Sequence, residues 1–209
     1  AKAALYAKAC SAAAQLRCAK AGMAGYRDMN LYGTQADGAS LKKVTGAEIE
    51  CFEMLEIVQR YEKISKDEKQ NVIDKCIKKW KFLKNPKAES IEKAAGYYLA
   101  VSKICAERGY KAVSLKDVDG MKKLLGFPPA PVFMLLADED GLCTVPENDC
   151  LGLITQLMVR FVTEQAAAYL EFYEFFDDGV LAGVPDYVPS EIAEGQTTVV
   201  PASFGELSE

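Results

Sequence analysis

Two glutamates, Glu147 and Glu171, stand where carboxylates could bind a metal ion. Glu147 directly precedes an expected helix over residues 149–163, and Glu171 lies near the end of an expected strand over residues 167–173. In a right-handed βαβ unit the carboxyl ends of strands and the amino ends of helices share one edge of the sheet, so the two carboxylates can converge on one ligand. Their oxygens suit a hard divalent cation such as Mn²⁺ or Mg²⁺, which takes about six donors and finds two here.

A helix start alone also accounts for the first glutamate. Residues 146–149, Pro-Glu-Asn-Asp, are typical of a helix start with Asn148 or Asp149 as N-cap. Glu171 would then be an exposed strand position. In both interpretations the partially positive amino end of the helix favours an anionic Glu147.

Two other groups of residues could bind a substrate. Arg27 and Asp28 follow an expected first strand, at the edge where open α/β sheets bind ligands. Arg27 could hold a phosphate or a hydroxyl, or the pair could brace its loop. Residues 171–178, Glu-Phe-Tyr-Glu-Phe-Phe-Asp-Asp, predict either a platform for a sugar ring or a strand with its aromatic side chains in the core and its acids outside.

The composition excludes several kinds of site. The 209 residues contain no histidine, so this sequence holds no Ser-His-Asp triad, Cys-His pair, H-E-x-x-H zinc site or imidazole proton shuttle. Seven cysteines without a C-x-x-C indicate reduced thiols. A net charge of −5 with scattered basic residues argues against nucleic acid, and no apolar run reaches the roughly 18 residues of a membrane span. We therefore expect a cytoplasmic protein without nucleic-acid or membrane partners.

The spacing of apolar residues predicts a mixed α/β fold. It places helices over residues 2–20, 39–45, 54–61, 66–84, 88–108, 121–125 and 149–163, and strands over residues 21–26, 47–52, 112–115, 131–137 and 167–173. The run 131–137 is the strongest strand candidate, because unbroken apolar runs are typical of parallel sheets covered on both faces. We expect a doubly wound, mainly parallel sheet with helices on both faces over residues 1–162, and the start of a β-rich domain over residues 163–209.

Two motifs resemble the L-fucose isomerase and L-arabinose isomerase family, in the family's order and at its spacing. The first is residues 144–152, TVPENDCLG, followed by an apolar helix, and the second is residues 166–173, AAAYLEFY. Shorter similarities lie at residues 25–29 (GYRDM), 116–120 (KDVDG), 192–195 (IAEG) and 203–205 (SFG). The resemblance is sharp between about residues 130 and 195, and it implies the second α/β domain of such an isomerase joined to the start of its carboxy-terminal domain.

The resemblance implies an aldose–ketose isomerisation through an ene-diol. A Mn²⁺-type ion, or another divalent cation such as Mg²⁺, would hold two sugar oxygens while a carboxylate moves a proton between adjacent carbons. Glu147 corresponds to the family's metal-binding and acid–base glutamate, and Glu171 to its second carboxylate ligand. Residues 183–186, Gly-Val-Pro-Asp, lack the histidine that the arabinose branch has there, so the sequence leans toward the fucose branch.

The resemblance also implies what the chain lacks and what it binds. The family's completing histidine ligand belongs to a region beyond Glu209, so we expect a fragment that is inactive alone. The implied partners are a monosaccharide and further copies of the chain, because the family's active site lies between subunits. The alternative is a non-catalytic sugar-binding or regulatory α/β module, which would bind a sugar without needing a metal.

Overall fold

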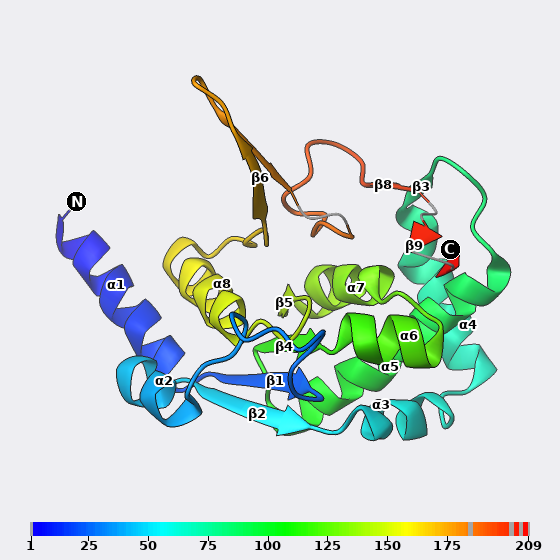
Figure 1. Cartoon of the computed structure of the whole chain (residues 1–209), viewed down its shortest axis with the longest axis horizontal. Coiled ribbons are helices and arrows are strands. Elements are labelled where there is room, and N and C mark those ends of the chain that lie inside the picture. Colours follow the sequence, from blue (N-terminus) through cyan, green and yellow to red (C-terminus); the bar gives the residue numbers. More distant parts are fainter. Residues whose placement is uncertain (1, 184–185, 201–202, 205–206, 209) are drawn as a thin grey trace.

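A four-stranded parallel sheet lies at the centre of the computed structural model, which describes residues 2–183, 186–200, 203–204 and 207–208 (Figure 1). The strand order is β2-β1-β4-β5. The bounds are β1 (Lys20–Ala24), β2 (Glu48–Phe52), β4 (Ala112–Leu115) and β5 (Cys143–Val145). Ala21 of β1 is in register with Ile49 and Ala112, and Ala112 is in register with Cys143.

The first face of the sheet carries the larger apolar cluster. Its helices are α3 (Met54–Tyr61), α4 (Lys66–Lys75), α5 (Ala88–Arg108) and α7 (Ala130–Asp140). The long helix α5 packs against the other three, and Val101, Ile104 and Phe133 have no exposed surface. Val113 and Leu115 of β4 point into this cluster. Burying side chains of this size is the main source of the fold's stability.

The second face carries a smaller cluster, formed by α1 (Lys2–Arg17) and α8 (Cys150–Thr163) with the strands. Ala112 of β4 points to this side, as the alternation of side chains along a strand requires. The short helix α2 (Gly38–Thr45) begins at Asp37, which caps it, and ends at Gly46 in the left-handed conformation. Helices on both faces of a parallel sheet confirm the predicted α/β fold (Figure 1).

The connections place a topological switch point between β1 and β4. From β1 the chain crosses through α2 to β2 on one side, and from β4 it crosses through α7 to β5 on the other side. The carboxyl ends of β1 and β4 therefore send their loops in opposite directions. In open α/β sheets the crevice between two such loops is where ligands bind.

The expected strand over residues 131–137 is wrong, because these residues lie in helix α7. Pro131 stands in the first turn of the helix and Gly141 ends it with a φ of 64°. Val132 to Leu136 are buried on all sides, so no polar stripe marks the helical period, and a short apolar run does not distinguish a buried helix from a buried strand. The strand at this place in the sheet is β5, whose three residues the apolar pattern missed.

Two other expected helices have different bounds. The expected helix over residues 66–84 ends at Lys75 and is followed by a 3₁₀ turn (Ile77–Lys79) and strand β3 (Lys81–Phe82), which pairs in parallel with β8 (Thr198–Val199). The expected helix over residues 121–125 is a π-helical segment (Asp117–Lys122) that continues into α6 (Lys123–Leu125). In the described part of the chain, no helix combines the length and apolar character needed to cross a membrane.

The chain after α8 forms small separate sheets. Strand β6 (Glu171–Phe175) pairs antiparallel with β7 (Val180–Gly183), and this hairpin projects from the body of the protein (Figure 1). Every residue of β6 is exposed, so the interpretation that its aromatic side chains lie in the core is wrong. Two short strands, β9 (Ser203–Phe204) and β10 (Leu207–Ser208), form another pair. The domain boundary between residues 162 and 163 stays a prediction.

Candidate functional site

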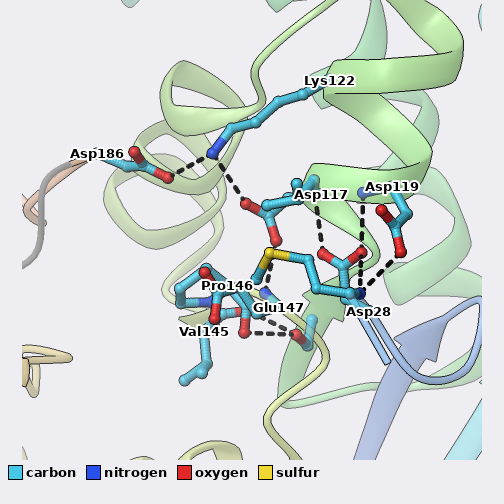
Figure 2. A network of polar contacts seen from close by, with 11 residues as sticks. Asp28, Asp117, Asp119, Lys122, Val145, Pro146, Glu147 and Asp186 are labelled. Atoms are coloured by element: carbon cyan, nitrogen blue, oxygen red, sulfur yellow. Dashed lines mark hydrogen bonds and ion pairs between the residues drawn. The ribbon is translucent and has the colours of Figure 1, made fainter. Parts of the chain in front are cut away.

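Three loops bring polar side chains together at the carboxyl edge of the sheet (Figure 2). Asp28 lies in the loop after β1, and Asp117 opens the π-helical segment after β4. Glu147 lies between β5 and α8. The three residues therefore surround the switch point, and their contacts come from backbone segments far apart in the sequence.

Asp28 has no exposed surface, and its carboxylate accepts hydrogen bonds from backbone amides. The N–H groups of Val118 and Asp119 each donate to it at 2.8 Å, and that of Met29 donates at 3.1 Å. The Met29 amide also donates to the Asp119 carboxylate at 2.8 Å. Asp28 thus fastens the loop after β1 to the segment after β4. Its predicted role in binding a substrate stays a prediction.

Lys122 is buried between two carboxylates (Figure 2). Its ammonium group lies 3.3 Å from Asp117 Oδ2 and 3.0 Å from Asp186 Oδ2, with 4% of the Lys122 side chain and 1% of the Asp117 side chain exposed. Burial raises the pKa of Asp117 to about 7, against the opposing effect of Lys122. Burial would lower the pKa of Lys122, but Asp117 and Asp186 raise it above its ordinary value. The attraction between Lys122 and the two carboxylates thus opposes the cost of burying the ammonium group.

Glu147 has a backbone conformation that few side chains adopt. Its φ is 60° and that of Asn148 is 52°, in the left-handed region that favours glycine. The Glu147 amide donates to Asp117 Oδ1 at 2.6 Å. The Asn148 side-chain amide donates to the carbonyls of Ala24, at 3.0 Å, and Tyr26. Such backbone strain persists only where surrounding contacts enforce it, and it clusters at functional sites.

The Glu147 carboxyl group is half-buried among other acids. Burial raises its pKa, and the charges of Glu171, Asp28 and Asp186 raise it further, while Lys122 lowers it. An excess of carboxylates over ammonium groups leaves this edge of the sheet negative. The Glu147 carboxyl group therefore holds its proton more tightly than an exposed glutamate does, and a bound cation would relieve the repulsion.

Glu171 lies in a different structural element than the sequence predicted. It is the first residue of β6, in the hairpin, and not near the end of a strand of the parallel sheet. The expected strand over residues 167–173 is therefore only partly correct. Glu171 is exposed, yet its charge acts on Glu147. The sequence argument for convergence assumed one βαβ unit, whereas in the structure Glu171 lies in the segment that follows α8 and acts on Glu147 through its charge.

Tyr169 ties this segment to the start of α8. Its hydroxyl donates to Asp149 Oδ2 at 3.4 Å, and Asp149 is also the N-cap that accepts the amides of Leu151 and Gly152. A Cβ atom on Gly152 would lie 3.1 Å from the Tyr169 ring, so glycine makes room for the ring there. Burial raises the pKa of Tyr169, and so do the charges of Asp149 and the two glutamates. Tyr169 therefore stands beside both predicted metal ligands.

Arg27 differs from its neighbour Asp28 in its contacts. Its guanidinium group donates to Asn30 Oδ1 at 3.1 Å and lies 4.3 Å from the centre of the Tyr32 ring. Both contacts are local, within the loop after β1. This side chain is half-buried, and its predicted role in binding a substrate stays a prediction.

The donor set fits a hard divalent cation in kind but not in number. Glu147 and Glu171 offer carboxylate oxygens, the type that Mn²⁺ and Mg²⁺ prefer. Within the described residues, no group of three or more His, Cys, Asp or Glu side chains is placed to hold a metal ion together. Two carboxylates would leave the remaining coordination positions to water, substrate oxygens or other ligands.

The sequence interpretation missed three members of this site: Asp117, Lys122 and Asp186. Asp117 had a usable signal, because it closely follows a short buried strand, as Asp28 does. Lys122 had none, since a lysine in a segment rich in charge is normally solvated. Asp186 comes from a distant part of the chain that only the folded structure brings near.

The chain has no match among models of known protein families or among curated protein sequences. The resemblance to sugar isomerases rests on the two motifs around Glu147 and Glu171 and stays a prediction.

Proposed function

We propose that this chain carries part of the active site of a divalent-metal-dependent aldose–ketose isomerase of the L-fucose and L-arabinose type. The observation that carries the proposal is Glu147 itself. A half-buried glutamate is kept in a strained backbone conformation at the switch point of the sheet, within electrostatic range of Glu171. Strain, burial and a second carboxylate at the usual ligand-binding edge together favour a reactive group over a helix start alone.

In this proposal Glu147 and Glu171 would hold Mn²⁺ or Mg²⁺. The cation supplies a positive charge that polarises two neighbouring sugar oxygens and stabilises the negative charge of an ene-diolate. The net reaction moves hydrogen without any external oxidant: the C2 proton of the aldose is transferred to C1, and the hydroxyl proton on O2 is transferred to O1. This produces the ketose.

Glu147 is the group in this chain best suited to move the carbon-bound proton. Its carboxylate would accept the proton from C2 and return it to C1. Arg27, in the loop at the same edge of the sheet, would donate hydrogen bonds to sugar hydroxyls. A monosaccharide substrate and an oligomer of several copies belong to the same proposal.

Titration calorimetry of Mn²⁺ into the chain tests the cation site. We expect weak binding that disappears in the double variant Glu147→Gln/Glu171→Gln. The matched control is Glu174→Gln/Asp178→Asn, which removes the same charge from the hairpin and should bind Mn²⁺ like the original chain. Absent binding, or binding that survives the loss of both glutamates, would contradict the proposal.

Deuterium exchange tests the reaction separately from metal binding. L-Fucose and L-arabinose would be incubated with the chain and Mn²⁺ in heavy water, and incorporation of deuterium at C1 or C2 followed by NMR. We expect slow, Mn²⁺-dependent exchange at C2 without net conversion to the ketose, because the chain lacks the implied histidine ligand, and we expect the single variant Glu147→Gln to abolish this exchange. Exchange that continues in this variant would assign the proton transfer to another group.

A non-catalytic sugar-binding module is the second candidate, and one observation favours it. The rings of Phe172 and Phe175 stack on each other in β6, with centres 5.7 Å apart, and both are exposed. Exposed aromatic rings beside a carboxylate could bind the apolar face of a sugar. This candidate predicts sugar binding without metal that Phe172→Ser weakens, and no deuterium exchange.

A further inference from the structure

We propose that Asp117 is a positioning residue for Glu147, holding the backbone of this glutamate so that its carboxylate stays beside that of Glu171. The inference rests on the proposed function in one respect, namely that Glu147 is a ligand of the cation. Asp117 would touch neither the cation nor the sugar. Its whole effect would pass through the amide of Glu147.

The contact that carries this inference is short and shielded from water. The Glu147 amide donates to Asp117 Oδ1 at 2.6 Å, and the Asp117 side chain is 1% exposed. Water is therefore poorly placed to replace the acceptor. An amide that lost this acceptor would drive Glu147 toward a conformation in which its N–H group reaches another partner.

Asp117 is itself held in place by Lys122. The ammonium group lies 3.3 Å from Asp117 Oδ2, on the opposite oxygen from the one that receives the Glu147 amide (Figure 2). One carboxylate oxygen thus faces a cation and the other faces the backbone. Asp186, 3.0 Å from the same ammonium group, fixes Lys122 from the other side. This arrangement leaves the Asp117 carboxylate little freedom to turn.

The residue after Glu147 has its own anchors. Asn148 donates from its side chain to the carbonyl groups of Ala24 and Tyr26. Ser114 donates to the Val145 carbonyl at 2.6 Å and so holds the chain before Glu147. Loss of the Asp117 acceptor should therefore release Glu147 while the residues on either side stay in place. That local effect separates a positioning role from a general role in folding.

Two double variants isolate the acceptor. In Asp117→Asn/Lys122→Met, the asparagine keeps an oxygen for the Glu147 amide and the buried charge pair is removed as a unit. In Asp117→Leu/Lys122→Met, the leucine is of similar size but offers no oxygen to accept a hydrogen bond from the Glu147 amide. The two variants differ only at residue 117, where one has an amide group and the other has two methyl groups. If the leucine variant does not fold, Asp117→Ala/Lys122→Met takes its place.

Two measurements follow in each folded variant. The first is the NMR chemical shifts of the Glu147 amide and α-carbon, which report the hydrogen bond and the left-handed backbone without any metal. The second is the Mn²⁺ affinity. We expect the asparagine variant to keep the shifts and most of the affinity. The leucine variant should lose the shifts and bind Mn²⁺ about 10- to 100-fold more weakly, the usual cost of losing a residue that orients a ligand.

The two measurements separate this inference from the proposed function. If the original chain does not bind Mn²⁺, the proposed function fails, and the Glu147 shifts alone then decide whether Asp117 holds its backbone. If the leucine variant keeps the Glu147 shifts, or binds Mn²⁺ as tightly as the asparagine variant does, Asp117 is not a positioning residue.

Discussion

Glu147 and Glu171 come from two regions of opposite character. Glu147 lies at the edge of the buried sheet, among side chains such as Asp117 and Asn148 that have no exposed surface. Glu171 opens a strand whose every residue is exposed, in a hairpin outside the main sheet. The backbone of Glu147 is fixed by a network of buried polar contacts, and Glu171 is placed by a segment with few buried contacts.

The regions around Glu147 and Glu171 would contribute differently to a cation site. The fixed region can set the distance and direction of one ligand, because its hydrogen bonds leave little freedom. A region with few buried contacts opens at low free-energy cost, so the second ligand can adjust to a cation or to a substrate. We therefore expect substitutions near Glu147 to change stability strongly and substitutions in the hairpin to change it little.

Removal of the buried ammonium group should have the largest effect. Lys122→Met leaves the Asp117 carboxyl group without its cation, and breaking a buried ion pair in this way costs about 3–5 kcal/mol of unfolding free energy. Urea unfolding at pH 8 measures the loss. The control is Lys123→Met, whose side chain is 61% exposed and whose ammonium group pairs with Asp119, and which should change the stability far less.

The unfolding free energy that Lys122→Met costs should depend on pH. The pKa of Asp117 is about 7 in the folded protein, above the value of about 4 for an unfolded chain, and it rises further without Lys122. A carboxyl group whose pKa is higher in the folded protein than in the unfolded chain stabilises the fold at a pH below its unfolded pKa. This contribution is lost as the pH rises through its folded pKa. The cost of Lys122→Met should therefore be nearly constant between about pH 4 and pH 7, where Asp117 is protonated in both folded proteins, and should grow above pH 7, where Asp117 ionises in the original protein but not in the variant. A cost that does not grow above pH 7 would show that Asp117 is not ionised in the original protein.

Asp28 and Arg27 are neighbours whose substitutions should differ. Asp28→Ala removes the acceptor of three backbone amides in a buried place, which we expect to cost about 3 kcal/mol. Arg27→Ala breaks only local loop contacts and should cost about 0.5 kcal/mol or less. Thermal unfolding checks both. Equal costs would mean that the loop after β1 is not fastened through Asp28.

The sequence predicted the parts of this molecule that depend on local pattern. The helices over residues 54–61 and 88–108 have the predicted bounds, because their apolar spacing, and the glycine that ends the second of them, are local signals. The sequence left the N-cap of the helix over residues 149–163 open between Asn148 and Asp149, and the structure shows that it is Asp149, whose side chain accepts from the amides of Leu151 and Gly152. Glu147 could be singled out because an acid before a helix at the edge of a sheet is visible in the sequence.

The parts that the sequence did not predict depend on burial and on distant contacts. Helix α7 was mistaken for a strand, because a helix buried on all sides shows no polar stripe. The buried pair of Asp117 and Lys122 was missed, because the desolvation that makes it important exists only in the folded state. The position of Glu171 in a hairpin outside the main sheet depends on strand pairing between β6 and β7, which periodicity alone does not determine.

Replacement of the strained glutamate should raise stability while it removes the proposed ligand. Glycine adopts a positive φ freely, so Glu147→Gly relieves about 1–2 kcal/mol of backbone strain and loses about 0.5–1 kcal/mol in chain entropy. We expect a net gain of about 1 kcal/mol by urea unfolding, together with loss of Mn²⁺ binding.

Glu164 provides the matched control for this substitution. It is also a glutamate in the left-handed region, with a φ of 64°, and it ends helix α8 away from the site. Glu164→Gly should stabilise the chain by a similar amount and leave Mn²⁺ binding unchanged. If Glu147→Gly lowers stability instead, the glutamate side chain itself contributes contacts that outweigh its backbone strain.

The hairpin should show the smallest effect on stability. Phe172 and Phe175 are 70% and 72% exposed, so Phe172→Ser/Phe175→Ser removes little buried surface and should change the unfolding free energy by about 0.5 kcal/mol or less. Mn²⁺ affinity should also stay the same if Glu171 is placed mainly by the Tyr169 contact with Asp149. Calorimetry on this variant and on Tyr169→Phe checks that reasoning. A larger loss of affinity from the hairpin substitution than from Tyr169→Phe would mean that the hairpin, and not the start of α8, positions the second carboxylate.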